Sequence, residues 1–358
     1  MDELQLARKL VSFDTVDSKP SVIPFLQKTL RTKGVRTKLV KTKGITSLLA
    51  FKGKGRPMLM LNGHYDTVPA GKGWKTKPLN PVVRQGKLIG LGSADMKSAL
   101  AAMVCAFLEA KPGKGTLVLA AVGDEEKGGF RGSSPLAQAL KPDFVIIGEP
   151  TSLDLALGHK AVLQLEIQLT GKAVHASRPG EGENAITAAA RLLQALETHF
   201  PLPHGTDEEV FEEVSMNVGT ISGGRATNVV ADACAFTLDF RLPPNLKHEY
   251  VLAIVKRLAS EYDAEVKVTE REPGFLEPGD SPLAGAAREE LGRVRKFREV
   301  KKLGATDARF FAAKGAQAII AGCGDPHVIH AANEFVPLRE VAQAKRFYQG
   351  LVAKLLAR

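Results

Sequence analysis

The sequence lacks the features that mark several common classes of protein. It has no apolar run of the roughly 18 residues or more that a membrane-spanning helix needs. It has only three cysteines, Cys105, Cys234 and Cys323, and each lies in an apolar setting. We therefore expect buried free thiols in a reducing compartment, rather than disulfides or a cysteine-bound metal, and a cytoplasmic location.

Aromatic residues are also scarce, and acidic residues are too few to balance the basic ones. Aromatic side chains make up 6% of the chain, which has a single tryptophan, and the net charge is +10. The basic segments 31–43, 52–56 and 72–77 are interleaved with Gly and Thr and carry no nucleic-acid-binding motif. We interpret the charge as a solvated basic surface, so a nucleic-acid partner is not expected. A milder functional interpretation is that the charge steers an anionic substrate.

The N-terminal segment does not resemble a signal peptide. Residues 1–10 open with acids and lack a long apolar core, while Leu4, Ala7, Leu10 and Val11 repeat at helical spacing. This pattern predicts an amphipathic first helix, and no membrane partner is expected.

What the sequence does contain is an alternation of strand-like and helix-like segments. The composition, 44% hydrophobic and 25% charged, is that of a globular protein long enough for one large domain or two. Short buried strands are predicted at 47–51, 57–61, 116–122 and 144–147, and helices at 18–32, 96–110 and 134–140. Such alternation favours an α/β fold with a mostly parallel sheet.

The pattern changes near residue 162, where apolar and polar residues begin to alternate as in a sheet with one solvated face. Strands at 162–170, 215–221, 233–241 and 265–269, with helices at 184–198 and 248–262, give the order β-α-β-β-α-β of a split βαβ, ferredoxin-like unit. Helices at 282–292, 306–314 and 339–357 and a strand at 316–321 follow. We predict a catalytic domain from residues 1–161 and 273–358, and an inserted α+β domain from residues 162–272.

Three consecutive acids, Asp124, Glu125 and Glu126, follow the strand predicted at 116–122. Carboxylates crowded into a partly buried site raise one another's pKa or need a cation. The triplet therefore suggests a metal whose other ligands come from elsewhere in the chain.

Candidate ligands follow other predicted strands. His64, Asp95, Glu149 and His330 each lie at or after the end of an element of the α/β domain. Taken singly, each has an ordinary explanation, such as a loop histidine, a helix cap for Asp95 or a solvated turn for Glu149. Taken together, they supply the oxygen and nitrogen donors of a divalent metal site, at the sheet edge where ligands gather.

The order of these motifs resembles the M20 metallopeptidase family. The motifs are His64-x-Asp66, Asp95-Met-Lys97, Asp124-Glu125-Glu126, Gly148-Glu149-Pro150 and His330-x-x-Asn333-Glu334, with Gly171 to Pro179 and Gly223 to Asn228 in the inserted domain. The resemblance spans nearly the whole chain. It implies a zinc-hydrolase catalytic domain with an inserted lid and dimerisation domain.

The resemblance also implies the metal ligands. One ion would be held by His64, Asp95 and Glu149, and the other by Asp95, Glu126 and His330, with Asp95 bridging. Two Zn²⁺ ions are expected, although such a carboxylate-rich site also suits Co²⁺ or Mn²⁺.

Further roles follow from the same resemblance. Asp66 would orient a ligand histidine, and Glu125 would be the general base that activates a metal-bridging water. His175, from the inserted domain of a partner subunit, would stabilise the oxyanion. Arg241 and Asn228 would bind the substrate carboxylate.

The expected reaction is hydrolysis of the amide of an N-acyl amino acid, of the N-succinyl-diaminopimelate or N-acetylornithine type. A dipeptidase or carboxypeptidase of the same family is the second hypothesis, because it also cleaves an amide next to a carboxylate. A non-catalytic binding protein is the remote one. The expected partners are the small-molecule substrate or a short peptide, and a second copy of the chain through the inserted domain.

Overall fold

The computed structural model describes residues 2–357, which form two compact units. The first combines Met1–Leu157, Glu277–Val300 and Thr306–Arg358, and the second combines Gly158–Leu276 with the short segment Lys301–Ala305. The boundaries proposed from the sequence, at 161/162 and 272/273, lie a few residues from these. The return at 301–305 was not predicted.

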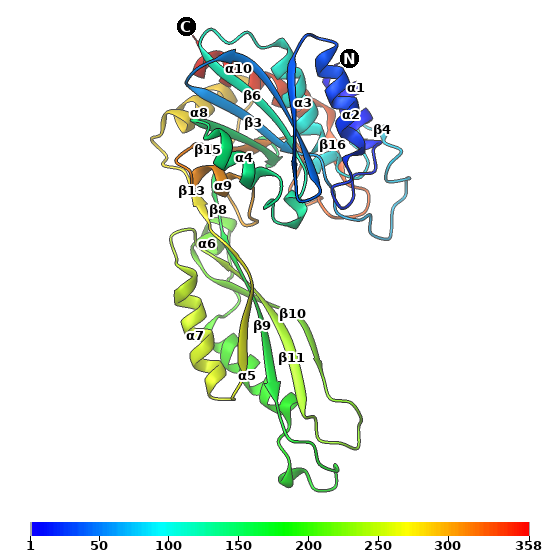
Figure 1. The fold of residues 1–358 in the computed structure, drawn as a ribbon, viewed down its shortest axis with the longest axis vertical. Coiled ribbons are helices and arrows are strands. Elements are labelled where there is room, and N and C mark those ends of the chain that lie inside the picture. The colour runs from blue at the N-terminus through cyan, green and yellow to red at the C-terminus, as the bar shows by residue number, and fades with distance from the viewer. Residues whose placement is uncertain (1, 358) are drawn as a thin grey trace. The chain divides into compact units, whose positions relative to one another are not determined.

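The first unit is built on a mostly parallel sheet, as the sequence predicts (Figure 1). Its strands, in spatial order, are β1 (Arg36–Thr42), β2 (Ile45–Lys54), β6 (Gly115–Val122), β3 (Met58–His64), β7 (Phe144–Pro150) and β15 (Gln317–Gly322). The last four run parallel, whereas β1 and β2 are antiparallel at one edge. Strands β8 (Leu155–His159), β13 (Phe275–Leu276) and β14 (Glu299–Lys302) lie where the chain passes between the units.

Helices cover both faces of this sheet. They are α1 (Glu3–Val11), α2 (Ile23–Arg31), α3 (Ser98–Glu109), α4 (Ser133–Leu140), α8 (Pro282–Val294), α9 (Ala308–Ala312) and α10 (Leu338–Leu355). Helix α3 packs on β3, β6 and β7 and is covered in turn by α1 and α10, which explains why nearly all of its residues are apolar and buried. All eight residues of β6 are buried, as expected for a strand covered on both faces.

Two predicted helices, those near residues 4 and 96, are present in the structure, but the second begins later than expected. The amphipathic first helix is confirmed, and an Asp2–Gln5 capping box begins it. The helix expected from residue 96 begins only at Ser98, because Ser93–Lys97 forms an irregular turn.

The small antiparallel sheet of β4 (Val82–Arg84), β5 (Lys87–Ile89) and β16 (Phe335–Pro337) was not predicted, because its strands are too short to show a period.

The second unit is a four-stranded antiparallel sheet with helices. Its elements are β9 (Ala161–Thr170), α5 (Ala185–His199), α6 (Asp207–Glu212), β10 (Ser215–Gly223), β11 (Ala233–Leu242), α7 (His248–Ser260) and β12 (Glu265–Glu272). The strand order β10-β11-β9-β12 and the succession β-α-β-β-α-β match the predicted split βαβ unit, with α6 as an addition. Alternate residues of β9 and β11 are buried with the inner faces of α5 and α7.

The three cysteines are buried and form no disulfide, as predicted. Within residues 2–357, no helix combines the length and apolar character that crossing a membrane requires.

Candidate metal centre

The candidate ligands converge because parallel strands end at the same edge of the sheet. His64 is the last residue of β3 and pairs in register with Val122, the last residue of β6. The acidic triplet follows β6 two residues later, and Glu149 is the penultimate residue of the neighbouring β7. Three segments that are far apart in the sequence therefore deliver polar side chains to one place.

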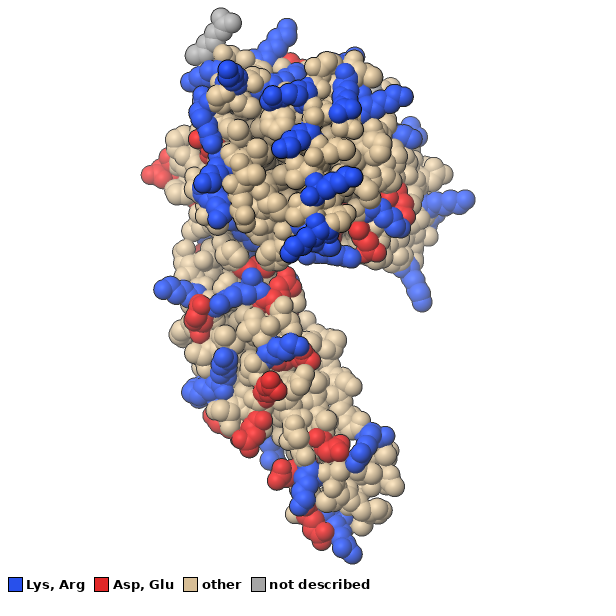
Figure 2. Space-filling model, in the orientation of Figure 1, with Lys and Arg blue, Asp and Glu red and all other residues tan. Residues whose placement is uncertain are grey.

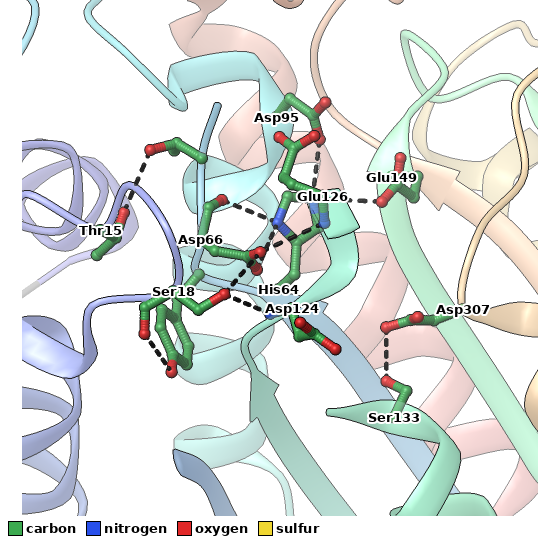
Figure 3. Close-up of polar contacts among 12 residues, drawn as sticks. Thr15, Ser18, His64, Asp66, Asp95, Asp124, Glu126, Ser133, Glu149 and Asp307 are labelled. Atoms are coloured by element: carbon green, nitrogen blue, oxygen red, sulfur yellow. Dashed lines mark hydrogen bonds and ion pairs between the residues drawn. The ribbon is translucent and has the colours of Figure 1, made fainter. Parts of the chain in front are cut away.

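The structure forms two groups of potential ligands that share one carboxylate. Figure 3 shows the first group, His64, Asp95 and Glu149, with Glu126 of the second beside it. In the first group, His64 Nε2 lies 2.9 Å from Asp95 Oδ1 and 3.3 Å from Glu149 Oε1. In the second, His330 Nε2 lies 3.4 Å from Asp95 Oδ2 and 3.0 Å from Glu126 Oε2. The two oxygens of Asp95 thus face different histidines, which is the arrangement of a bridging carboxylate.

This set of donors suits a pair of divalent ions. It offers two imidazole nitrogens and three carboxylates, a combination that Zn²⁺, Co²⁺ and Mn²⁺ accept. Burial raises the pKa of Glu126, and the nearby Asp95 charge raises it further. Such crowding of buried acids is unfavourable without positive charge, so the residues present fit a metal centre.

His64 is oriented mainly by the main chain of Asp66. Its Nδ1 lies 3.0 Å from the Asp66 carbonyl oxygen and 3.5 Å from Oδ1 of the same residue. Because a carbonyl only accepts, Nδ1 carries the hydrogen and Nε2 is left to face Asp95 and Glu149. Burial lowers the pKa of His64, but hydrogen bonds to Asp66, Asp95 and Glu149 outweigh it, and the net pKa is well above the usual value.

Asp95 is not a helix cap, in contrast to the sequence-based alternative. It lies in the irregular turn before α3, with φ −120°, ψ 98° and a cis peptide to Met96. The buried Glu334 carboxylate accepts hydrogen bonds from the backbone N–H groups of Gly92 (2.9 Å), Ala94 (2.7 Å) and Asp95 (3.0 Å). Glu334 therefore shapes the turn that presents Asp95, a role that the sequence did not reveal.

His330 comes from the loop after β15 and has a positive φ of 58°. Hydrogen bonds to the Asp95 and Glu126 carboxylates raise its pKa to about 10. The neighbouring His327 is exposed, belongs to neither group and follows Asp325, whose side chain accepts its backbone N–H. The geometry therefore brings His330, the histidine expected as a ligand, into the second group and leaves His327 outside it.

The acidic triplet divides into three roles. Asp124 accepts hydrogen bonds from the Arg131 backbone N–H (2.9 Å) and Nε (2.8 Å), so it closes the turn after β6. Glu126 joins the second ligand group. Glu125 belongs to neither group, and burial together with the charge of Glu149 raises its pKa well above the usual range. Glu125 is therefore a carboxyl group that lies beside the candidate metal centre without being one of its potential ligands.

A buried network that the sequence analysis missed supports these segments (Figure 3). Asn62 on β3 donates to Ser133 Oγ (3.0 Å), and Ser133 donates to Asp307 Oδ2 (2.6 Å). Ser18 Oγ contacts Asp66 Oδ2 (3.2 Å) and accepts the backbone N–H of Asp124 (2.8 Å). Asp307 directly precedes the short helix α9, and no local sequence signal distinguishes it from an ordinary residue at the start of a helix.

The other predicted site residues lie in the second unit. His175 is exposed, and its Nδ1 lies 2.8 Å from Ser177 Oγ. Ala176, which follows His175, donates its backbone N–H to the Asn228 carbonyl. His175 and Asn228 therefore belong to adjacent segments. Arg241 pairs with Asp239 at 2.6 Å.

Asn228 and Arg241 lie toward opposite ends of the segment that contains β11. Asn228 comes five residues before Ala233, the first residue of the strand, whereas Arg241 is its penultimate residue. With a rise of about 3.3 Å per residue, the stretch from Ala233 to Arg241 alone spans on the order of 26 Å. Their joint role in binding a substrate carboxylate stays a prediction.

Comparisons with known proteins extend these observations. A family model described as "Peptidase family M20/M25/M40" matches residues 60–354. The chain is 30% identical to an acetylornithine deacetylase of Myxococcus xanthus, over 96% of this chain and 95% of the relative. It is 32% identical to a succinyl-diaminopimelate desuccinylase of Zymomonas mobilis, over 72% and 73% of the two chains. An M20 metallo-carboxypeptidase from Sulfolobus solfataricus has a similar fold, with a TM-score of 0.82 at 20% identity over 99% of both chains.

Proposed function

The chain belongs to the peptidase family M20/M25/M40 and is an enzyme that acts on amide bonds, and on that premise we propose that it is a metal-dependent deacylase of N-acyl amino acids. The observation that carries the proposal is the pair of ligand groups that share Asp95, with Glu125 beside them. The relatives named as deacetylase and desuccinylase support an acyl group of the acetyl or succinyl type.

The proposed ligands are those of the two groups: His64, Asp95 and Glu149 for one ion, and Asp95, Glu126 and His330 for the other. When bound, divalent ions would polarise the amide carbonyl and lower the pKa of water. Zn²⁺ is the proposed metal, with Co²⁺ or Mn²⁺ as substitutes.

The remaining steps are assigned to the protein's own side chains. Glu125 would accept a proton from the attacking water and return it to the leaving nitrogen, because it is the acid of the triplet that is not engaged elsewhere. Asp66 would keep His64 in the tautomer with Nε2 unprotonated. Since burial raises the pKa of Glu125, the pocket already favours holding a proton on it.

We propose that the second unit contributes from a partner subunit in a homodimer. The placement of Asn228 before the start of β11 and of Arg241 near its end supports this, because two chains could together bring both residues to one substrate. Strand β10 lies at the edge of its sheet and is mostly exposed, including Ile221, so its backbone groups are available for pairing. In this arrangement His175 would stabilise the oxyanion.

The test is a substrate panel with zinc-loaded protein: N-succinyl-diaminopimelate, N-acetylornithine and a set of dipeptides. Hydrolysis of the N-acyl amino acids, with little turnover of peptides, is the expected result. Exclusive peptide cleavage would instead establish the second hypothesis, a dipeptidase or carboxypeptidase.

A further inference from the structure

Two stretches of the first unit are rich in basic residues and contain no acid. Residues 67–94 contain five Lys or Arg and no Asp or Glu, and residues 18–65 contain eleven and none. Figure 2 shows Lys and Arg over the visible face of the first unit, with few acids among them. An anion near this surface therefore meets a positive field with little local compensation.

One lysine-bearing loop, residues 69–80, adjoins the candidate metal centre at its start and in its middle. It begins three residues after Asp66. Its middle is fastened to the His330 loop, because Lys75 donates its backbone N–H to Asn333 Oδ1 (2.7 Å) and Asn333 Nδ2 donates to the Gly73 carbonyl (3.3 Å). The loop is therefore held beside a ligand-bearing segment.

The three lysines of this loop, Lys72, Lys75 and Lys77, are exposed. Within residues 2–357 none of them takes part in an ion pair with an acid. By contrast, Lys19 and Lys127, which also flank the site, are paired at 2.6 Å with Asp14 and Asp17. The positive charge of the loop is thus available to a ligand, whereas the charges of Lys19 and Lys127 are already neutralised by acids of the same chain.

A groove along the loop combines an apolar wall with a cation. It has a volume of about 550 Å³, and its apolar lining includes Pro69, Pro78, Leu79 and Leu91. The charged residues of the lining are Lys77 and the ion pair of Asp14 with Lys19, so Lys77 carries its unpaired charge. Leu91 is buried and lies four residues before Asp95. An apolar lining beside a cation suits a short carbon chain that ends in a carboxylate.

We propose that the lysine loop selects substrates whose acyl group carries its own carboxylate. This inference rests on the proposed deacylase function and deepens it. An N-succinyl amino acid differs from its N-acetyl counterpart by one extra carboxylate, so attraction by Lys72, Lys75 and Lys77 favours the succinyl compound specifically.

The experiment compares N-succinyl and N-acetyl derivatives of the same amino acid at low ionic strength. Replacing Lys72, Lys75 and Lys77 together by Gln is expected to lower the succinyl-to-acetyl ratio of kcat/KM about eightfold, as the loss of three unit charges roughly 10 Å away would in water. Added salt should also lower the succinyl-to-acetyl ratio of the wild type, because salt screens the charges of the lysines.

The matched control replaces the exposed lysines Lys33, Lys38 and Lys41 by Gln. It removes the same charge at or near β1, three strands from β3 in the sheet order. An unchanged ratio in the loop variant overturns the proposal. An equal fall in the control does so as well, because it would assign the effect to net charge.

A binding measurement separates this proposal from the proposed function. Trp74, the only tryptophan of the chain, lies in the loop, so its fluorescence reports on ligands there. Succinate should perturb it at lower concentration than acetate, and the difference should shrink in the loop variant. If neither N-acyl compound is hydrolysed, the deacylase function fails while this titration still tests the loop. Equal responses to succinate and acetate overturn the loop proposal.

Discussion

The Glu334 carboxylate holds the backbone of Asp95, accepting its N–H at 3.0 Å while also binding the N–H groups of Gly92 and Ala94. The side chain that faces both histidines is therefore positioned by a second acid that faces neither. Burial raises the pKa of Glu334 to about 7, so this arrangement weakens on acidification.

Replacing Glu334 by Gln should weaken metal binding by about tenfold to a hundredfold, as loss of a group that orients a ligand usually does. The amide retains one accepting oxygen but turns an NH₂ group toward backbone donors. Calorimetric titration with Zn²⁺ measures the change. Glu277→Gln is the control, because Glu277 is also buried and accepts the Ala318 N–H, at 2.9 Å, without contacting a ligand. Equal affinity in the two variants would remove the role assigned to Glu334.

Glu125→Gln should lower kcat by at least about a hundredfold, because the amide cannot carry the proton between water and the leaving amine. Its metal content should stay that of the wild type, since Glu125 belongs to neither ligand group. Elemental analysis and turnover are measured on the same preparation. Retained activity would show that the base is another residue.

His330→Ala should bind one metal ion fewer per chain, because it removes the only nitrogen donor of the second ligand group. His327→Ala, three residues away, should bind as much metal as the wild type, since His327 is in neither group. Metal stoichiometry after dialysis gives the answer. A loss of metal in His327→Ala would reverse the assignment.

If His175 acts from a partner subunit, two inactive variants should complement each other. His175→Ala and Glu125→Gln would each lack activity alone. A mixed dimer would contain one site with both residues intact, so partial activity should return on co-assembly. Sedimentation must show a dimer, and the absence of any recovery in a proven mixed dimer would place His175 outside the reaction.

The second unit has its own pH-dependent element in Lys160. Burial lowers the pKa of Lys160 to about 8, although its Nζ donates to the carbonyls of Val210 (2.7 Å) and Glu213 (2.6 Å). Between pH 8 and the usual value of 10.5, the unfolded chain binds a proton that the folded chain does not. The free energy of unfolding should therefore rise with pH in this window, by on the order of 3 kcal/mol from this group.

Lys160→Met tests this directly. Urea unfolding at pH 8 and pH 10.5 should show a smaller increase in stability for the variant than for the wild type. The exposed Lys256→Met serves as the control and should keep the wild-type increase. An identical increase in all three proteins would mean that Lys160 is charged in the folded state throughout.

The sequence predicted those features that depend on local pattern. The buried strands of the first unit appear as short apolar runs, and the ligands follow them, so the sheet and the convergence at its edge could be predicted. Strand β1 could not, because Lys38 and Lys41 make it polar and it is a strand only through pairing with β2. The backbone of Asp95 could not either, because it depends on Glu334, more than two hundred positions away in the chain.

Resemblance to a family supplied two predictions that local pattern did not, namely Glu125 as the base and His330 as a metal ligand. It did not supply the Asn62–Ser133–Asp307 network, because hydrogen bonds between distant buried residues leave no periodic trace. Nor did it reveal that Asn228 lies before the start of β11 while Arg241 lies near its end, which depends on where the strand begins.

The register of β3 on β6 limits which length changes the protein tolerates. The two strands pair without interruption from Met58↔Thr116 to His64↔Val122. Deleting one residue within either strand would turn every following side chain to the opposite face of the sheet, and would carry His64 or the acidic triplet out of alignment by about 3.3 Å. Insertions and deletions should therefore be confined to the loops, whereas point substitutions inside these strands remain open to natural variation.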